Sequence, residues 1–252
     1  MVTNINEMVK AEMHLGHPTR KWNPKMAPYI YAERNGIYII DLIQTYYHLK
    51  KVSKFLTEAA SQNKKFLFIG TKKQASKLIE QAARQCDSHF VNQRWLGGML
   101  TNWKTIKASI KKLNELEIRE KNQEFKVLPK KQFATYKKDK ERLEKYLSGL
   151  QTMTEIPDVV IIIGQVEEMN AVKECQKLGL RNITILDTNC NPSSADLFVP
   201  ANDDSVSSIK TILNEFVQSI IMGQKKYTEK SPLGSFENQN KTQLKYSKHV
   251  RK

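Results

Sequence analysis

A pair of histidines near the N-terminus is the first place where this sequence offers metal chemistry. His14 and His17 form an H-x-x-H pair, a spacing at which two imidazoles on one helix face can bind a metal ion. Gly16 and Pro18 favour a loop here instead, and Glu12 is the only further ligand nearby in the sequence. We therefore predict no metal site and no cofactor.

Two pairs of adjacent carboxylates, Glu167–Glu168 and Asp203–Asp204, could hold a cation or supply an acid and a base. Each pair lies where a helix is predicted to begin. Carboxylates at that position cap free amides and offset the helix dipole. We interpret both pairs as helix-capping residues.

The three cysteines, Cys86, Cys175 and Cys190, are far apart, and no C-x-x-C pair occurs. This pattern argues against a zinc ribbon or a thioredoxin-like motif and indicates reduced thiols. No G-x-S-x-G elbow and no Cys/His nucleophile signature is present either. The residues therefore predict that the chain is not an enzyme.

The elements that would position these residues follow an alternating order. Apolar runs of strand length alternate with amphipathic segments of helical period, which is typical of a doubly wound parallel sheet of the flavodoxin or Rossmann kind. We expect strands at 37–42, 64–70, 89–92, 158–164, 183–187 and 197–200, and helices at 4–14, 44–61, 73–86, 167–179 and 205–222.

Residues 103–150 differ from this rhythm. Two charged helical segments with narrow apolar stripes lie on either side of Pro129, which must interrupt a continuous helix, and they predict an inserted coiled-coil hairpin. The expected organisation is an N-terminal helix and basic loop (1–36), an α/β sheet domain (37–102 and 151–223), the inserted hairpin (103–150) and a basic, disordered tail (224–252).

A nucleotide-binding enzyme of the same fold is the main alternative, and a pure protein-interaction scaffold is a second. The dinucleotide fingerprint G-x-G-x-x-G is not met after the strand ending at Gly70. Ala75 and Ser76 stand where a P-loop needs Gly and Lys. Lys72 and Lys73 still lie where a helix N-terminus can bind phosphate, from RNA as readily as from a nucleotide.

The net charge of +15 is unevenly distributed. It amounts to +8 over residues 1–100, +7 over 101–150, −6 over 151–223 and +6 over 224–252. Three basic segments indicate a polyanionic partner, namely a nucleic acid. No apolar run approaches the roughly 20 residues that span a bilayer, so we expect no membrane partner. Because the nucleotide-binding motifs are not met, we also expect no small-molecule substrate.

The basic segments combine cations with aromatic rings, a pairing that suits phosphates and splayed RNA bases. The run FVNQRWLGGMLTNWKTI (90–106) leads into a helix with a lysine stripe, and we expect its Trp95 and Trp103 to pack rather than to stack on bases. The predicted RNA-binding residues are Arg20, Lys21, Trp22, Lys25, Lys72, Lys73, Arg94, Lys104 and Lys107.

Six motifs, in order, resemble the bacterial- and plastid-type second protein of the small ribosomal subunit: HLGHPTRKWNPKMAPYIY, FLFIGTKKQAS, FVNQRWLGGMLTNWKTI, IPDVVII, LDTNCNP and VPANDDSVSSI. The resemblance covers about residues 4–223, and RKWNPKMAPYI and DTNC are most similar to plastid-encoded members. It implies a doubly wound domain with an inserted coiled-coil hairpin and a structural role in translation.

The resemblance also implies partners and a location. Members bind ribosomal RNA between the head and body of the small subunit and contact neighbouring ribosomal proteins, including a large RNA-binding one. We expect the ribosome of the chloroplast stroma, with the bacterial cytoplasm as the alternative. The chain departs from the family pattern at Gly164, at Asn191 and at Arg181–Asn182. These departures lie in the acidic segment and leave the basic segments untouched.

Overall fold

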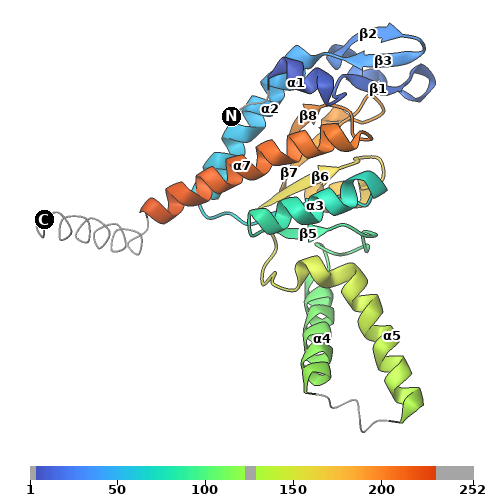
Figure 1. Cartoon of the computed structure of the whole chain (residues 1–252), viewed down its shortest axis with the longest axis vertical. Helices are drawn as coiled ribbons and strands as arrows, with labels where there is room; N and C mark the ends of the chain where they lie inside the picture. Colours follow the sequence, from blue (N-terminus) through green and yellow to red (C-terminus); the bar gives the residue numbers. More distant parts are fainter. Residues whose placement is uncertain (1–3, 123–128, 231–252) are drawn as a thin grey trace, which may run out of the picture.

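A five-stranded parallel sheet forms the centre of the computed structural model, which describes residues 4–122 and 129–230 (Figure 1). Its strand order is β5-β4-β6-β7-β8, so the chain reverses direction across the sheet between β4 and β6. This confirms the predicted doubly wound α/β fold. The strands are β4 (Phe66–Ile69), β5 (His89–Val91), β6 (Val159–Ile163), β7 (Arg181–Leu186) and β8 (Leu197–Pro200).

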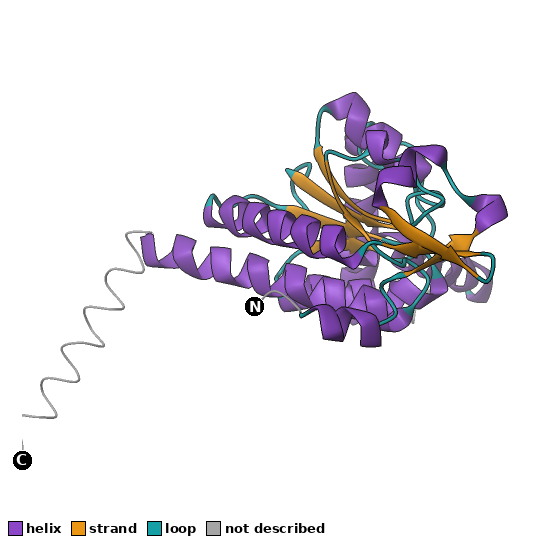
Figure 2. Cartoon of the chain, turned by 90° about the horizontal axis from the view of Figure 1, so that it is seen from above, coloured by secondary structure: helices purple, strands orange, loops and turns teal. Residues whose placement is uncertain are grey.

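The strands are apolar on both faces because both faces are covered by helices (Figure 2). Alternate residues face opposite sides: Phe68 and Ile161 join one core, whereas Leu67 and Ile162 join the other. The first core is formed with α1 (Ile5–Lys10), α2 (Leu42–Ser61), α3 (Lys73–Gln85) and α7 (Val206–Lys230). The second core is formed with α6 (Met169–Leu178) and the segment that follows β5.

The segment 14–40 forms a separate antiparallel sheet of order β1-β3-β2, and the prediction of a loop over most of it is wrong. The predicted strand at 37–42 belongs to this small sheet and not to the parallel one. Two 3-10 helices lie between the first two strands. The elements are β1 (Leu15–Pro18), η1 (Thr19–Lys21), η2 (Pro24–Tyr29), β2 (Ile30–Arg34) and β3 (Ile37–Ile40).

Two helices, α4 (Trp103–Lys121) and α5 (Lys130–Leu147), are inserted between β5 and β6 and project from the sheet (Figure 1). Pro129 is the N-cap residue of α5. Proline is tolerated at the start of a helix but not in its interior, so the break falls there. Ion pairs join the helices between Lys112 and Asp139, at 3.5 Å, and between Lys140 and Glu120. A short 3-10 helix, η4 (Ser148–Leu150), leads back to the sheet. That the two helices form a coiled coil stays a prediction.

Helix α7 extends to Lys230, eight residues beyond the predicted end at Met222. The first residues of the predicted tail, 224–230, are therefore helical, and the rest of it, 231–252, lies outside the described residues. None of the helices in residues 4–122 and 129–230 is long and apolar enough to cross a membrane.

Substitution of Gly223 tests whether the extended part of α7 packs on α2. A methyl group at this buried position would overlap the backbone oxygen of Thr57 and the Cβ of Ala60 in α2. We expect Gly223→Ala to lower the free energy of unfolding by about 1–3 kcal/mol through overpacking. In an unpacked helix the same change would raise it by about 1 kcal/mol. Urea unfolding followed by circular dichroism measures the sign, and Gly97→Ala, with no atom within 4 Å of the new methyl group, is the control.

Candidate functional site

The point where the strand order reverses, at the carboxyl ends of β4 and β6, is where doubly wound sheets usually bind ligands. Here it is occupied by a cluster of charged side chains. The Lys72 side chain is 9% exposed, and its ammonium nitrogen lies 2.7 Å from Asp203 and 2.8 Å from Asp204. Glu167 lies 3.8 Å from the same nitrogen. Lys72 therefore neutralises the chain's own carboxylates.

His17 extends this cluster to the small antiparallel sheet. Its Nδ1 lies 3.0 Å from an oxygen of Asp187, which follows β7, and its Nε2 lies 3.4 Å from Asp204. The hydroxyl of Thr188 accepts a hydrogen bond from the His17 amide at 2.9 Å. These contacts dock the N-terminal sheet over the carboxyl edge of the parallel sheet.

The backbone amide of Thr71, which could otherwise bind a phosphate at this edge, is already hydrogen-bonded within the chain. The Glu168 carboxylate accepts a hydrogen bond from the Thr71 amide at 2.8 Å. The interpretation of the two acidic pairs as helix caps is wrong, because these carboxylates bind Thr71, Lys72 and His17. In the segment before α7, the Oδ1 of Asn202 accepts from the amides of Asp204 and Ser205.

Protonation in the cluster follows from these contacts. The hydrogen bond to Asp187 raises the pKa of His17 against the opposing effect of burial. Burial lowers the pKa of Lys72, but the carboxylates of Asp203 and Asp204 outweigh it and raise the pKa overall. Burial, together with the negative charge of Asp187, raises the pKa of Asp203 to about 6.

His17, Asp187 and Asp204 also have the side-chain types of a metal site, with ligand atoms within 4.8 Å of one another. Both imidazole nitrogens, however, already face a carboxylate, and the Lys72 ammonium already lies beside Asp204. The donors are those of an ion-pair network, and a second cation there would be repelled by the ammonium. His14 is not part of this group.

The run 92–102 is held by a single carboxylate that the sequence did not reveal. Glu174 of α6 accepts hydrogen bonds from Trp95 Nε1 at 3.0 Å and from the Gly98 amide at 2.8 Å. It also accepts from the amides of Leu100 and Thr101, both at 3.0 Å, and from the Thr101 hydroxyl at 3.1 Å. Burial raises the pKa of Glu174, but these bonds outweigh that effect and lower it overall.

Trp95 and Trp103 pack as expected, and Trp22, which was predicted to bind RNA, also packs within the chain. Trp95 is buried, and Trp103 packs against the same core. Gly98 has φ +85°, which favours glycine in the turn between them. Trp22 is half-buried, with its ring centroid 5.1 Å from that of Tyr38. The loop that leads to α4 is therefore a rigid structural connection.

The remaining predicted RNA-binding residues are exposed cations, and none of them has an ion-pair partner within residues 4–122 and 129–230. They lie on the 3-10 helices of the N-terminal segment, at the start of α3, in the loop after β5 and on α4. They are Arg20, Lys21, Lys25, Lys73, Arg94, Lys104 and Lys107.

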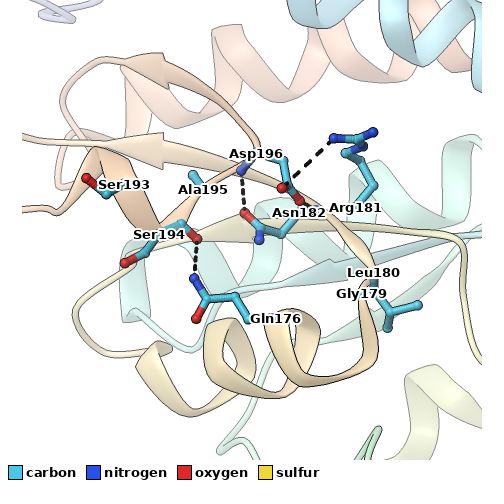
Figure 3. Close-up of a pocket in the computed structure, with 9 residues that line it drawn as sticks. All are labelled: Gln176, Gly179, Leu180, Arg181, Asn182, Ser193, Ser194, Ala195 and Asp196. Atoms are coloured by element: carbon cyan, nitrogen blue, oxygen red, sulfur yellow. Dashed lines mark hydrogen bonds and ion pairs between the residues drawn. The ribbon is translucent and has the colours of Figure 1, made fainter.

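A polar pocket of about 340 Å³ lies at the opposite edge of the sheet, where β7 begins (Figure 3). Its side chains bind one another: Gln176 donates to the Ser194 carbonyl at 3.3 Å, and the Asp196 amide donates to Asn182 at 3.1 Å. Arg181 lies 3.9 Å from Asp196. These groups are partnered within the pocket and leave no excess charge for a ligand.

Comparison with known proteins decides between the resemblance found in the sequence and the nucleotide-binding alternative. The family described as Ribosomal protein S2 matches residues 8–223 of the chain. The chain belongs to the ribosomal protein S2 family. This confirms the resemblance seen in the sequence, the structural ribosomal role and the prediction that the protein is not an enzyme.

Individual members of the family are similar over most of their length. The small ribosomal subunit protein uS2c of Oltmannsiellopsis viridis is 62% identical, over 93% of this chain and 98% of the relative. That of Chlorella vulgaris is 54% identical, over 90% and 85%. Small ribosomal subunit protein uS2 of Trichormus variabilis is 48% identical, over 88% and 84%.

The ion-pair network predicts a large difference between two adjacent lysines. Lys72→Met should lower the free energy of unfolding by about 3–5 kcal/mol, because it leaves the buried Asp203 without its partner. The control, Lys73→Met, removes an exposed charge and should change it by less than about 0.5 kcal/mol. Urea denaturation measures both. Equal effects would contradict the role of Lys72 in the network.

Glu174 predicts an effect that depends on pH. Glu174→Gln loses charge-assisted acceptors for the loop and should cost about 2–3 kcal/mol near pH 7. Because the folded pKa is lowered, this contribution is present above the unfolded value of about 4.3 and lost as pH falls through the folded pKa. Unfolding midpoints from pH 3 to 7 should therefore converge for the two proteins at low pH. Glu155→Gln, at an exposed position, is the control.

Proposed function

We propose that the chain, as a structural constituent of the small ribosomal subunit, binds ribosomal RNA through the seven exposed cations Arg20, Lys21, Lys25, Lys73, Arg94, Lys104 and Lys107. One contrast carries the proposal. Lys72 is enclosed by carboxylates, whereas its neighbour Lys73 and the other six cations are exposed without an ion-pair partner among the described residues. We therefore leave Lys72 out of the RNA-binding set.

Phosphate neutralisation supplies most of the affinity in this proposal, since each exposed cation displaces counterions from the RNA. The rigid attachment of the loop 92–102 by Glu174 supports it, because Arg94, Lys104 and Lys107 are held in place before the RNA arrives. Preorganised groups lose less conformational entropy on binding. Trp22, packed against Tyr38, supports the shape of the loop that carries Arg20, Lys21 and Lys25.

The nucleotide-binding alternative has little support at the carboxyl edge of the sheet. Glu168 accepts from the Thr71 amide, and Glu167, Asp203 and Asp204 surround the nearest ammonium group. A nucleotide phosphate would meet carboxylates at that point and would have to displace them.

The proposed location is the chloroplast ribosome, with neighbouring small-subunit proteins as further partners. The name uS2c, used for chloroplast-encoded proteins, is carried by the relatives from Oltmannsiellopsis viridis and Chlorella vulgaris and by one from Rhodomonas salina that is 49% identical. The acidic segment 151–223 is the part of the chain that would face a basic neighbour or solvent.

Salt-dependent RNA binding tests the proposal. The triple variant Arg20→Gln, Lys21→Gln, Lys25→Gln should bind small-subunit RNA more weakly, and its plot of log affinity against log salt should be flatter by about 2–3 units. A matched variant, Lys173→Gln, Lys177→Gln, Lys210→Gln, removes the same charge from exposed positions of the acidic segment. Filter binding between 50 and 300 mM salt compares them. Equal slopes for the two variants would refute the assignment of the N-terminal cations.

A further inference from the structure

A groove of about 480 Å³ runs between α2 and α7, on the sheet face opposite α4. The two helices lie side by side: the Thr57 hydroxyl of α2 donates to the Ser219 carbonyl of α7 at 3.1 Å, and Gly223 of α7 packs against Thr57 and Ala60 of α2 (Figure 1). Tyr47, Lys51, Lys54 and Thr57 line it from α2, and Glu215, Ser219 and Met222 line it from α7.

The groove leaves large apolar side chains in contact with solvent. Tyr47 is 65% exposed and Met222 is 51% exposed; Ile43, which lies outside the groove but one helical turn before Tyr47, is 72% exposed. Aromatic and methionine side chains are enriched at the centres of protein interfaces, and an exposed apolar stripe marks such a surface.

The rim of the groove is positive. Lys50, Lys51 and Lys54 are exposed on α2, and Lys54 lies 4.0 Å from the Glu58 carboxylate. Glu215 lines the groove from α7 and is buried. Ser53, which also lines the groove, is buried, and its hydroxyl has no hydrogen-bond partner among the residues that the structure describes.

We propose that this groove binds an amphipathic, acidic helix from a neighbouring protein. An apolar floor between two helices accepts the apolar face of a third helix, and three rim lysines complement carboxylates on its flanks. RNA would use the lysines but would leave the exposed Met222 side chain without a role. The proposal depends on the proposed function only for the place of the partner, which is the small ribosomal subunit.

Photo-crosslinking in the intact subunit tests this directly. Small subunits are assembled with the full chain carrying benzoylphenylalanine in place of Tyr47, and crosslinked peptides or nucleotides are identified by mass spectrometry. We expect a crosslink to one protein segment that is acidic and has apolar residues at three- and four-residue steps. Reversal of the rim in the variant K50E/K51E/K54E should reduce its yield about tenfold, as loss of about 1.4 kcal/mol would. The same label in place of Gln81, exposed on α3, is the positional control.

The other outcomes are equally informative. A crosslink to RNA, the absence of any crosslink from incorporated chain, or a peptide crosslink that survives rim reversal or also forms from position 81 would overturn the inference while leaving the proposed function intact. Absence of the chain from the small-subunit fraction after sedimentation would contradict the proposed function, and the inference would fall with it. Circular dichroism verifies that the rim variant is folded.

Discussion

The bridge between the Lys72 ammonium and the carboxylates of Asp203 and Asp204 is the interaction on which the rest of the structure depends. It lies at the reversal point of the sheet, where an enzyme of this fold would open a crevice for its ligand. One cation there joins the loop after β4 to the segment before α7, and His17 links the N-terminal sheet to the same carboxylates. The place where this fold usually binds a ligand is here a contact between the loop after β4, the segment before α7 and the N-terminal sheet.

This ion-pair network distinguishes a cation that is used within the fold from the cations that we propose bind RNA. The ammonium group of Lys72 is paired with carboxylates of the chain, whereas the neighbouring Lys73 is exposed. A similar division applies to the loop 92–102. Its amides converge on the Glu174 carboxylate, while Arg94 stays exposed. The run has no acid of its own between Asp87 and Glu115, and its acceptor comes from a helix more than 70 residues later.

The parts of the fold that the sequence predicted are those governed by local pattern. The continuous apolar runs of β4, β6 and β7 predicted buried parallel strands, Pro129 predicted the break between α4 and α5, and Gly179 predicted the end of α6. The small sheet was missed because its strands are short and pair with one another without a periodic pattern. The length of α7 was missed because Gly223, a poor helix former, packs closely on α2.

The candidate site was harder to predict, because its partners are distant in sequence. The cationic residues could be chosen from charge and aromatic content, but nothing near Lys72 showed that acids 131 and 132 residues away would enclose it. Lysine acetylation rates, measured by mass spectrometry on the free protein and on the assembled small subunit, test the central claim most directly. Lys72 should be unreactive in both, whereas Lys21, Lys25, Lys73 and Lys104 should react in the free protein and be protected in the subunit. Rapid acetylation of Lys72 in the free protein, or continued reactivity of the other four in the subunit, would contradict it.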